Sequence, residues 1–142
     1  MKLVVTLFLI ALFTCEEHKL INLKCENREL LIRKSKVEIS KDNEVLLNKD
    51  FDKIWFAERS DWIVIEKGEN YILFDCCNID EGFEWSKSLF AINSFYVSGE
   101  RVFFPVEDNA NYELYEIERE LDRFLVVDIV IDSSMIELEI YE

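Results

Sequence analysis

The chain has 142 residues, of which 50% are hydrophobic and 13% aromatic, and its formal net charge is −14. This length is typical of one domain with a real core, because apolar and aromatic residues run through the whole sequence. Thirty acidic residues against 16 basic ones disfavour nucleic acid as a partner, since like charges repel. A basic protein or a neutral glycan is compatible with this charge.

The first 14 residues have the layout of an export signal. Lys2 is their only charged residue, and residues 3–13 are apolar apart from Thr6. A basic start followed by a short apolar run is typical of a signal peptide, and this run is shorter than the roughly 20 residues of a membrane-spanning helix. We therefore predict a signal peptide at residues 1–14, a tether with the first strand at 15–27, and a single mostly β domain at 28–142.

A short segment at the end of the apolar run consists of Leu12, Phe13, Thr14 and Cys15. It resembles the lipobox of bacterial lipoproteins, in which a cysteine that follows a small residue is lipidated. It departs from that pattern where Phe13 is bulkier than usual and Thr14 replaces glycine, alanine or serine. The resemblance covers this segment alone. It implies lipidation of Cys15, a membrane anchor, and a place in the cell envelope, in the periplasm or on the outer-membrane surface.

If Cys15 carries the lipid, three cysteines remain as disulfide candidates. In an oxidising compartment they predict one disulfide and one leftover thiol. Cys76 and Cys77 are adjacent, so in a strand they point to opposite faces and only one of them can readily meet Cys25. Three unbonded core cysteines are the alternative. These residues and His18 lack the paired spacing of a zinc site, so we expect no metal and no cofactor.

Apolar and polar residues alternate with a period of two along much of the chain, which predicts β-strands. Only three Gly and one Pro occur, so Asn, Asp and Ser clusters mark most turns. The clearest hairpin joins residues 62–66 to 71–74 through a turn at Gly68. Short strands are expected before it, at residues 21–25, 30–32 and 37–39.

The second half of the chain predicts two further pairs of strands. Residues 95–97 turn through Gly99 into a strand at 102–104, which Pro105 ends. Residues 124–131 turn at 132–134 into a last strand, on which three apolar residues share one face: Ile136, Leu138 and Ile140.

Two segments are ambiguous between helix and strand. Residues 50–59 have apolar side chains at helical spacing, and so do residues 111–123, although the second segment also alternates like a strand. We expect one helix, at 111–123. The predicted fold class is therefore mainly β, a single antiparallel sheet domain with one helix, arranged as a meander, a sandwich or a small barrel.

The segment from Asn78 to Trp85 concentrates three carboxylates and two large aromatic side chains around Gly82. Turn chemistry predicts a loop here, and exposed aromatic residues anchor protein contacts or stack on sugar rings. The alternative is that both aromatic side chains pack onto the core, since large exposed aromatics are rare. The candidate contact residues are Asp80, Glu81, Phe83, Glu84 and Trp85.

No segment has the spacing of a phosphate-binding loop, a metalloprotease helix or a nucleophile elbow. The charge and the small β scaffold favour a membrane-tethered, non-enzymatic module whose acidic face captures a basic protein, as inhibitors and immunity proteins of toxins do. A second hypothesis is a carbohydrate-binding or structural envelope protein that uses Trp55, Trp62 or Trp85 as stacking platforms. A hydrolase with paired carboxylates is the third.

Overall fold

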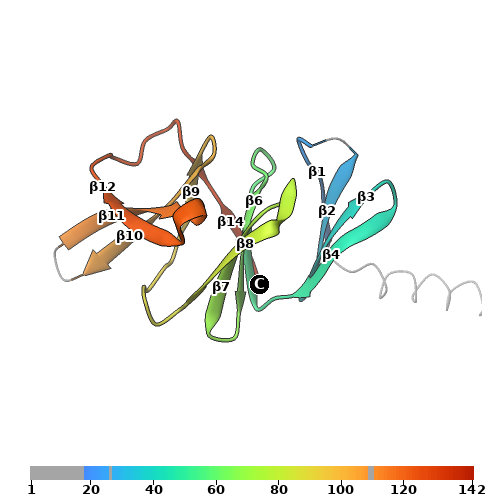
Figure 1. Cartoon of the computed structure of the whole chain (residues 1–142), viewed down its shortest axis with the longest axis horizontal. Coiled ribbons are helices and arrows are strands. Elements are labelled where there is room, and N and C mark those ends of the chain that lie inside the picture. Colours follow the sequence, from blue (N-terminus) through green and yellow to red (C-terminus); the bar gives the residue numbers. More distant parts are fainter. Residues whose placement is uncertain (1–17, 26, 109–110) are drawn as a thin grey trace, which may run out of the picture.

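The chain folds into three antiparallel β-sheets and almost no helix. A computed structural model describes residues 18–25, 27–108 and 111–142 (Figure 1). The one helical element among these residues is a 3-10 turn of three residues, η1, at Arg119–Leu121. The prediction of a mainly β, antiparallel fold is confirmed, and the strands form three separate sheets, which we call A, B and C.

Sheet A is a four-stranded meander in which each strand pairs with the next along the chain. Buried residues such as Leu30 and Ile39 alternate with more exposed ones, as a sheet with one covered face requires. Asp42 and Asn43 both have positive φ, 51° and 64°, which suits the two-residue turn between the last two strands. The strands are β1 (His18–Asn22), β2 (Arg28–Arg33), β3 (Lys36–Lys41) and β4 (Glu44–Asp50).

Sheet B lies in the middle of the molecule, and both of its faces are covered. Its strand β6 (Trp62–Lys67) has five consecutive buried residues, which explains why its sequence is a nearly continuous apolar run. Gly68 has φ of 58° in the turn that follows, confirming the predicted hairpin. In sheet order the strands are β14 (Glu139–Tyr141), β5 (Lys53–Phe56), β6, β7 (Asn70–Asp75) and β8 (Asn78–Ser86).

Sheet C contains the second predicted hairpin, whose turn has Gly99 at φ of 60°. After η1 the backbone reverses at Asp122, which adopts the left-handed conformation. In sheet order the strands are β12 (Arg123–Val127), β11 (Asn111–Glu118), β10 (Arg101–Asp108), β9 (Tyr96–Ser98) and β13 (Ile136–Glu137).

The three sheets lie side by side in the order A, B, C, and two hydrophobic cores fill the spaces between them (Figure 1). The A/B core consists of Ile21, Leu30, Ile32, Val37, Ile39, Phe51, Ile54, Phe56, Ile63, Ile65, Phe74 and Cys76. The B/C core consists of Trp55, Ala57, Trp62, Val64, Tyr71, Leu73, Phe83, Trp85, Ile92, Phe95, Val97, Val102, Phe104, Ile117 and Leu138. Sheet B contributes alternate side chains to each core.

The segment 136–141 connects sheets C and B. Its first part, β13, pairs with β9, and its second part, β14, pairs with β5. Leu138 lies between them, 3% exposed, and its backbone N–H donates to the carbonyl oxygen of Phe95 at 2.9 Å. The single last strand predicted here is therefore wrong, because the chain leaves one sheet for another and Ile140 stays 49% exposed.

The helix predicted at residues 111–123 is also wrong, since these residues form β11, η1 and the start of β12. Leu114 and Ile117 point to opposite faces of β11, yet both are buried, at 2% and 6% exposure. Burial on both faces of one strand places apolar residues three positions apart and imitates helical spacing. Residues 50–59 contain strand β5 rather than a helix for the same reason, since sheet B is covered on both sides.

Pro105 does not end its strand as predicted, because β10 continues to Asp108. The pairing of β10 with β9 stops at Phe103 and Tyr96, whereas the pairing with β11 continues past Pro105. Beyond Phe103 the strand therefore has a partner on one side only, which is where a residue without an N–H donor is tolerated.

Candidate binding groove

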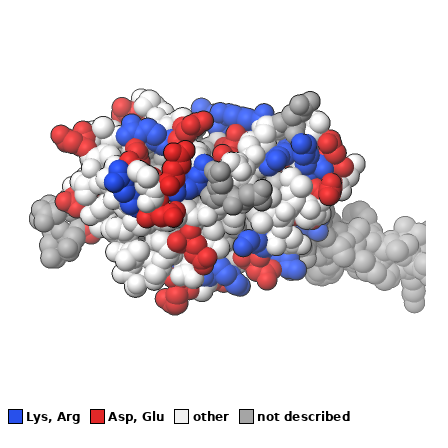
Figure 2. All heavy atoms as spheres, viewed as in Figure 1, with Lys and Arg blue, Asp and Glu red and all other residues white. Residues whose placement is uncertain are grey.

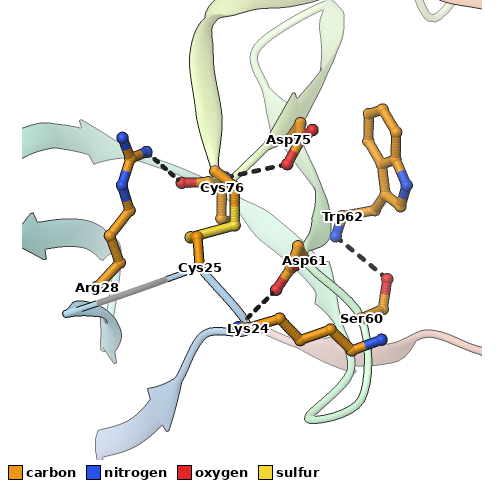
Figure 3. Close-up of a disulfide and its surroundings, with 9 residues drawn as sticks. Lys24, Cys25, Arg28, Ser60, Asp61, Trp62, Asp75 and Cys76 are labelled. Atoms are coloured by element: carbon orange, nitrogen blue, oxygen red, sulfur yellow. Dashed lines mark hydrogen bonds between the residues drawn. A yellow bond between two sulfur atoms is a disulfide. The ribbon is translucent and has the colours of Figure 1, made fainter. Parts of the chain in front are cut away.

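A disulfide between Cys25 and Cys77 joins the β1–β2 connection of sheet A to the β7–β8 turn of sheet B (Figure 3). Of the arrangements that the sequence leaves open, the structure has one disulfide and one thiol. Close to the disulfide, Arg28 Nη1 donates to the carbonyl oxygen of Cys76 at 2.9 Å, and the Lys24 backbone N–H donates to Asp61 Oδ1 at 3.1 Å. Sheets A and B are thus linked covalently and by hydrogen bonds at this end.

Cys76 is a free thiol that is fully buried in the A/B core. Burial, together with the carboxylates of Asp61 and Asp75, holds its pKa well above the ordinary value for cysteine. Because the thiolate is the reactive form, this residue has the properties of a structural cysteine and not of a nucleophile.

The predicted contact loop is the strand β8. Phe83 and Trp85 are 9% and 5% exposed, and their rings stack at 5.4 Å within the B/C core. The prediction that they are exposed contact residues is therefore wrong, because alternation along β8 turns both toward sheet C. Glu84 is exposed and accepts a hydrogen bond from an asparagine side chain of β7 at 3.0 Å. Asp80 and Glu81 also belong to β8, and their side chains lie outside what the structure describes.

The three tryptophans that could have stacked on sugars are all buried. Trp55, Trp62 and Trp85 are 2%, 8% and 5% exposed and belong to the B/C core. Trp55 and Trp85 each meet the ring of Phe95 edge to face, at 5.1 and 6.4 Å. A stacking platform needs an exposed ring face, so these residues do not provide one.

A groove of about 510 Å³ opens at one end of the interface between sheets B and C. Its floor is the end of the B/C core and includes Trp62, Leu73, Val102 and Ile117. Its rim is polar, with two guanidinium groups, from β10 and η1, and five carboxylates, from β7, the β9–β10 turn, β11 and η1. The carboxylates are those of Asp75, Glu100, Glu116, Glu118 and Glu120.

The two arginines of the groove are held by its own walls. Arg101 Nε donates to Glu116 Oε1 at 2.6 Å, and its guanidinium lies 4.9 Å from the centre of the Phe103 ring. Arg119 lies over the ring of Trp62, 4.7 Å from its centre. The carboxylates still outnumber the guanidinium groups, so an apolar floor with an acidic rim suits the methylene stem and the cation of a lysine or arginine side chain.

These rim residues are not among the site residues predicted from the sequence. In a strand, Glu116 and Glu118 point to the same face, and Glu100 follows the glycine of the β9–β10 turn. The alternation of carboxylates along β11 is the signal that could have revealed the rim. The helical interpretation of residues 111–123 hid it.

The acidic residues are unevenly distributed along the chain. Residues 18–53, which include sheet A, hold nine Lys or Arg and seven Asp or Glu, whereas residues 54–142 hold six and 21. The net charges are therefore +2 and −15. In Figure 2 a band of acidic atoms with basic atoms beside it crosses the left half of the view, which is the side of sheet C in Figure 1. The negative potential is concentrated on sheets B and C.

Within the described ranges, no group of three or more His, Cys, Asp or Glu side chains is placed to hold a metal ion. Nor does that part of the chain contain a helix long and apolar enough to cross a membrane. The predicted signal peptide and Cys15 lie outside the described residues. Comparisons with protein-family models, with curated proteins and with solved structures found no match to this chain.

Proposed function

We propose that the protein is an exported, membrane-tethered acidic binding module that captures a basic protein, as inhibitor and immunity proteins do. The observation that carries this proposal is the separation of charge, +2 on residues 18–53 and −15 on residues 54–142. A surface of one sign attracts a partner of the opposite sign, speeds encounter and repels wrong partners. The B/C groove offers this partner an apolar floor inside an acidic rim.

The disulfide supports the export part of the proposal. Disulfides persist in oxidising compartments and are rare where thiols are kept reduced. The bond between Cys25 and Cys77 is consistent with a protein that works outside the cytosol. The lipobox-like segment at Cys15 supports the anchor.

The order of the sheets suits a tethered receptor. Cys15 precedes the first residue of β1 by three positions, so at most about 10 Å of extended chain separates the anchor from sheet A. Sheet B lies between sheets A and C. The anchor would therefore attach at sheet A, which carries little net charge, and the acidic surface of sheets B and C would be left for the partner.

The test is capture of proteins from the native cell envelope by the full chain at low and high salt. One variant carries Glu100→Gln and Glu120→Gln on the groove rim. The matched control carries Glu29→Gln and Glu44→Gln on sheet A, where both residues are also exposed and the change in charge is the same. All three proteins are compared by the amount of each captured protein.

We expect basic proteins to be captured at low salt, to be released at high salt, and to be captured less by the groove variant than by the control. An electrostatic interface behaves this way because added salt shortens the distance over which exposed charges interact, from about 30 Å at 0.01 M to about 3 Å at 1 M. Capture that ignores salt, or that both variants reduce equally, would refute the acidic groove as the binding site.

A further inference from the structure

We propose that β12 is a docking edge, at which an extended segment of the basic partner adds to sheet C as a further strand. The inference rests on the proposed function and says how the partner is held. Strand addition supplies affinity through main-chain hydrogen bonds and specificity through alternate side chains. Three independent features of β12 support it: its position, its exposed apolar side chains and the charges at its ends.

The position of β12 leaves one of its edges open. It is the end strand of sheet C and pairs with β11 through a continuous register from Leu114–Val127 to Glu118–Arg123 (Figure 1). On the opposite edge its backbone N–H and C=O groups face no further strand among the described residues. An end strand of this kind is a template for another strand.

Exposed apolar side chains are concentrated along the sequence in β12 and on either side of it. Nine large hydrophobic residues are exposed in the described structure, and four of them lie within ten consecutive positions. They are Leu121, Val126, Ile129 and Val130, which are 62%, 58%, 37% and 80% exposed. Val126 lies on the strand itself, and covering it with a partner strand would remove apolar area from water, which is favourable.

The end strand β4 of sheet A is different. It includes charged Glu44, Lys49 and Asp50, and its pairing with β3 is interrupted by a register shift at Ile39 and Ser40. Charges and irregular pairing are the devices that protect sheet edges from unwanted pairing. β12 has a single charged residue, Arg123, which pairs with Glu118. The contrast makes β12 the better candidate for strand addition.

Carboxylates stand at both ends of β12. Glu120 and Asp122 precede it, and Asp128 and Asp132 follow it. A fitting segment would therefore have apolar residues in its middle and lysines or arginines at both ends. A second copy of β12 fits poorly, because pairing two copies brings the carboxylates at their ends together and like charges repel.

The test uses a synthetic peptide of sequence Lys-Lys-Thr-Val-Thr-Val-Thr-Lys-Lys, whose binding to the full chain is measured by fluorescence anisotropy. One control peptide has glutamate in place of every lysine. Another has the original sequence with N-methyl groups on its central amides, which removes the backbone donors and keeps the charge. We expect binding of the first peptide alone, together with slower amide exchange in β12.

Variants locate the site. Val126→Lys places a charge on the proposed edge, and Val45→Lys places the same charge on β4, where the original residue is similarly exposed at 52%. We expect Val126→Lys to weaken peptide binding at least tenfold and Val45→Lys to change it less than twofold. Equal effects of the two variants, or equal binding of the N-methylated peptide, would overturn the proposal.

The outcomes separate this inference from the proposed function. One outcome is that the envelope partner is captured in a salt-dependent manner and that Val126→Lys captures it as well as the unchanged chain does. This result would support the acidic binding module and refute the docking edge at β12. If sedimentation shows a dimer of the free chain that Val126→Lys dissociates, the edge binds a second copy, and the inference of a basic partner at β12 is wrong.

Discussion

The two cores of this molecule lie on opposite faces of one sheet and are built differently. Six isoleucines fill much of the A/B core, and the disulfide links its two sheets. Seven aromatic residues dominate the B/C core, where ring contacts extend from Trp55 through Phe95 to Phe104. The comparison shows two ways of joining sheets: aliphatic packing with a covalent link, and a network of rings.

The ring network has a feature that the A/B core lacks. The indole N–H groups of Trp55 and Trp85 are buried without a hydrogen-bond partner. Both tryptophans meet Phe95 edge to face, and Phe95 also contacts the rings of Tyr71 and Phe104. Phe95 therefore lies at the centre of the ring contacts of the B/C core.

The largest expected effect comes from removing this ring. Phe95→Ala should lower the free energy of unfolding by about 4 kcal/mol, as measured by urea denaturation, because it leaves a cavity among several rings. Phe56→Ala is the matched variant in the A/B core, at 1% exposure against 0% for Phe95, and should cost about 3 kcal/mol. A larger loss for Phe56→Ala would reverse the proposed contrast between the cores.

Removal of the disulfide should have the next largest effect. The bond closes a loop with a sequence separation of 52. Disulfides typically contribute about 2–4 kcal/mol, and replacing Cys25 and Cys77 by serine should cost about 3 kcal/mol. Hydrogen exchange should become faster at the amides of β1 and β2 and stay unchanged in β10 and β11. Equal acceleration in sheet C would show that the two cores are not independently held.

The smallest effect concerns pH and the Cys76 thiol. Its pKa is raised in the folded chain, so above about pH 8.5 it ionises in the unfolded chain and stays protonated in the folded one. Stability should therefore fall as the pH rises, by about 2 kcal/mol between pH 8 and pH 10.

This loss should be measured in the background that lacks Cys25 and Cys77, where no disulfide exchange occurs. Adding Cys76→Ala removes the ionising group and should remove this part of the pH dependence. If the two proteins lose equal stability between pH 8 and pH 10, the burial of Cys76 does not couple to folding.

The sequence predicted the strands that flank a glycine turn. The hairpin through Gly68 and the hairpin through Gly99 follow from short runs of β-branched and aromatic residues on either side of the glycine, and both are present. Strand β4 was not anticipated, because Val45, Leu46 and Leu47 are consecutive and a register shift interrupts its pairing. Alternation of apolar and polar residues indicates a regular strand with one buried face. It is lost where a strand is paired irregularly, as β4 is.

The largest errors came from sheet B and its neighbours. A sheet covered on both sides has no polar face, so its strands do not alternate. Their sequence therefore does not indicate whether the domain has one core or two. Gly82 was interpreted as a turn residue, but a side chain there would lie 2.7 Å from the ring of Phe74. This glycine is explained by close packing within β8, and the aromatic residues beside it belong to the core.

The acidic character of the candidate site was predictable from the sequence, but its position in the fold was not. Composition indicated an acidic surface, but the groove depends on β7, β10 and β11 coming together at one end of sheets B and C. These segments are distant in the sequence, and no local pattern encodes their meeting. The one local signal was the spacing of Glu116 and Glu118, which places both carboxylates on the same face of β11.

The division of the last segment between two sheets has a consequence for how the chain folds. Most strands pair with the strand next to them in the sequence, and such pairs form quickly because the loops to be closed are short. The pairing of Ile54 with Tyr141 instead closes a loop that contains the whole of sheet C. The pairing of β14 with β5 should be the slow step of folding. Until it forms, β5 is an unpaired edge strand, which favours aggregation of the partly folded chain.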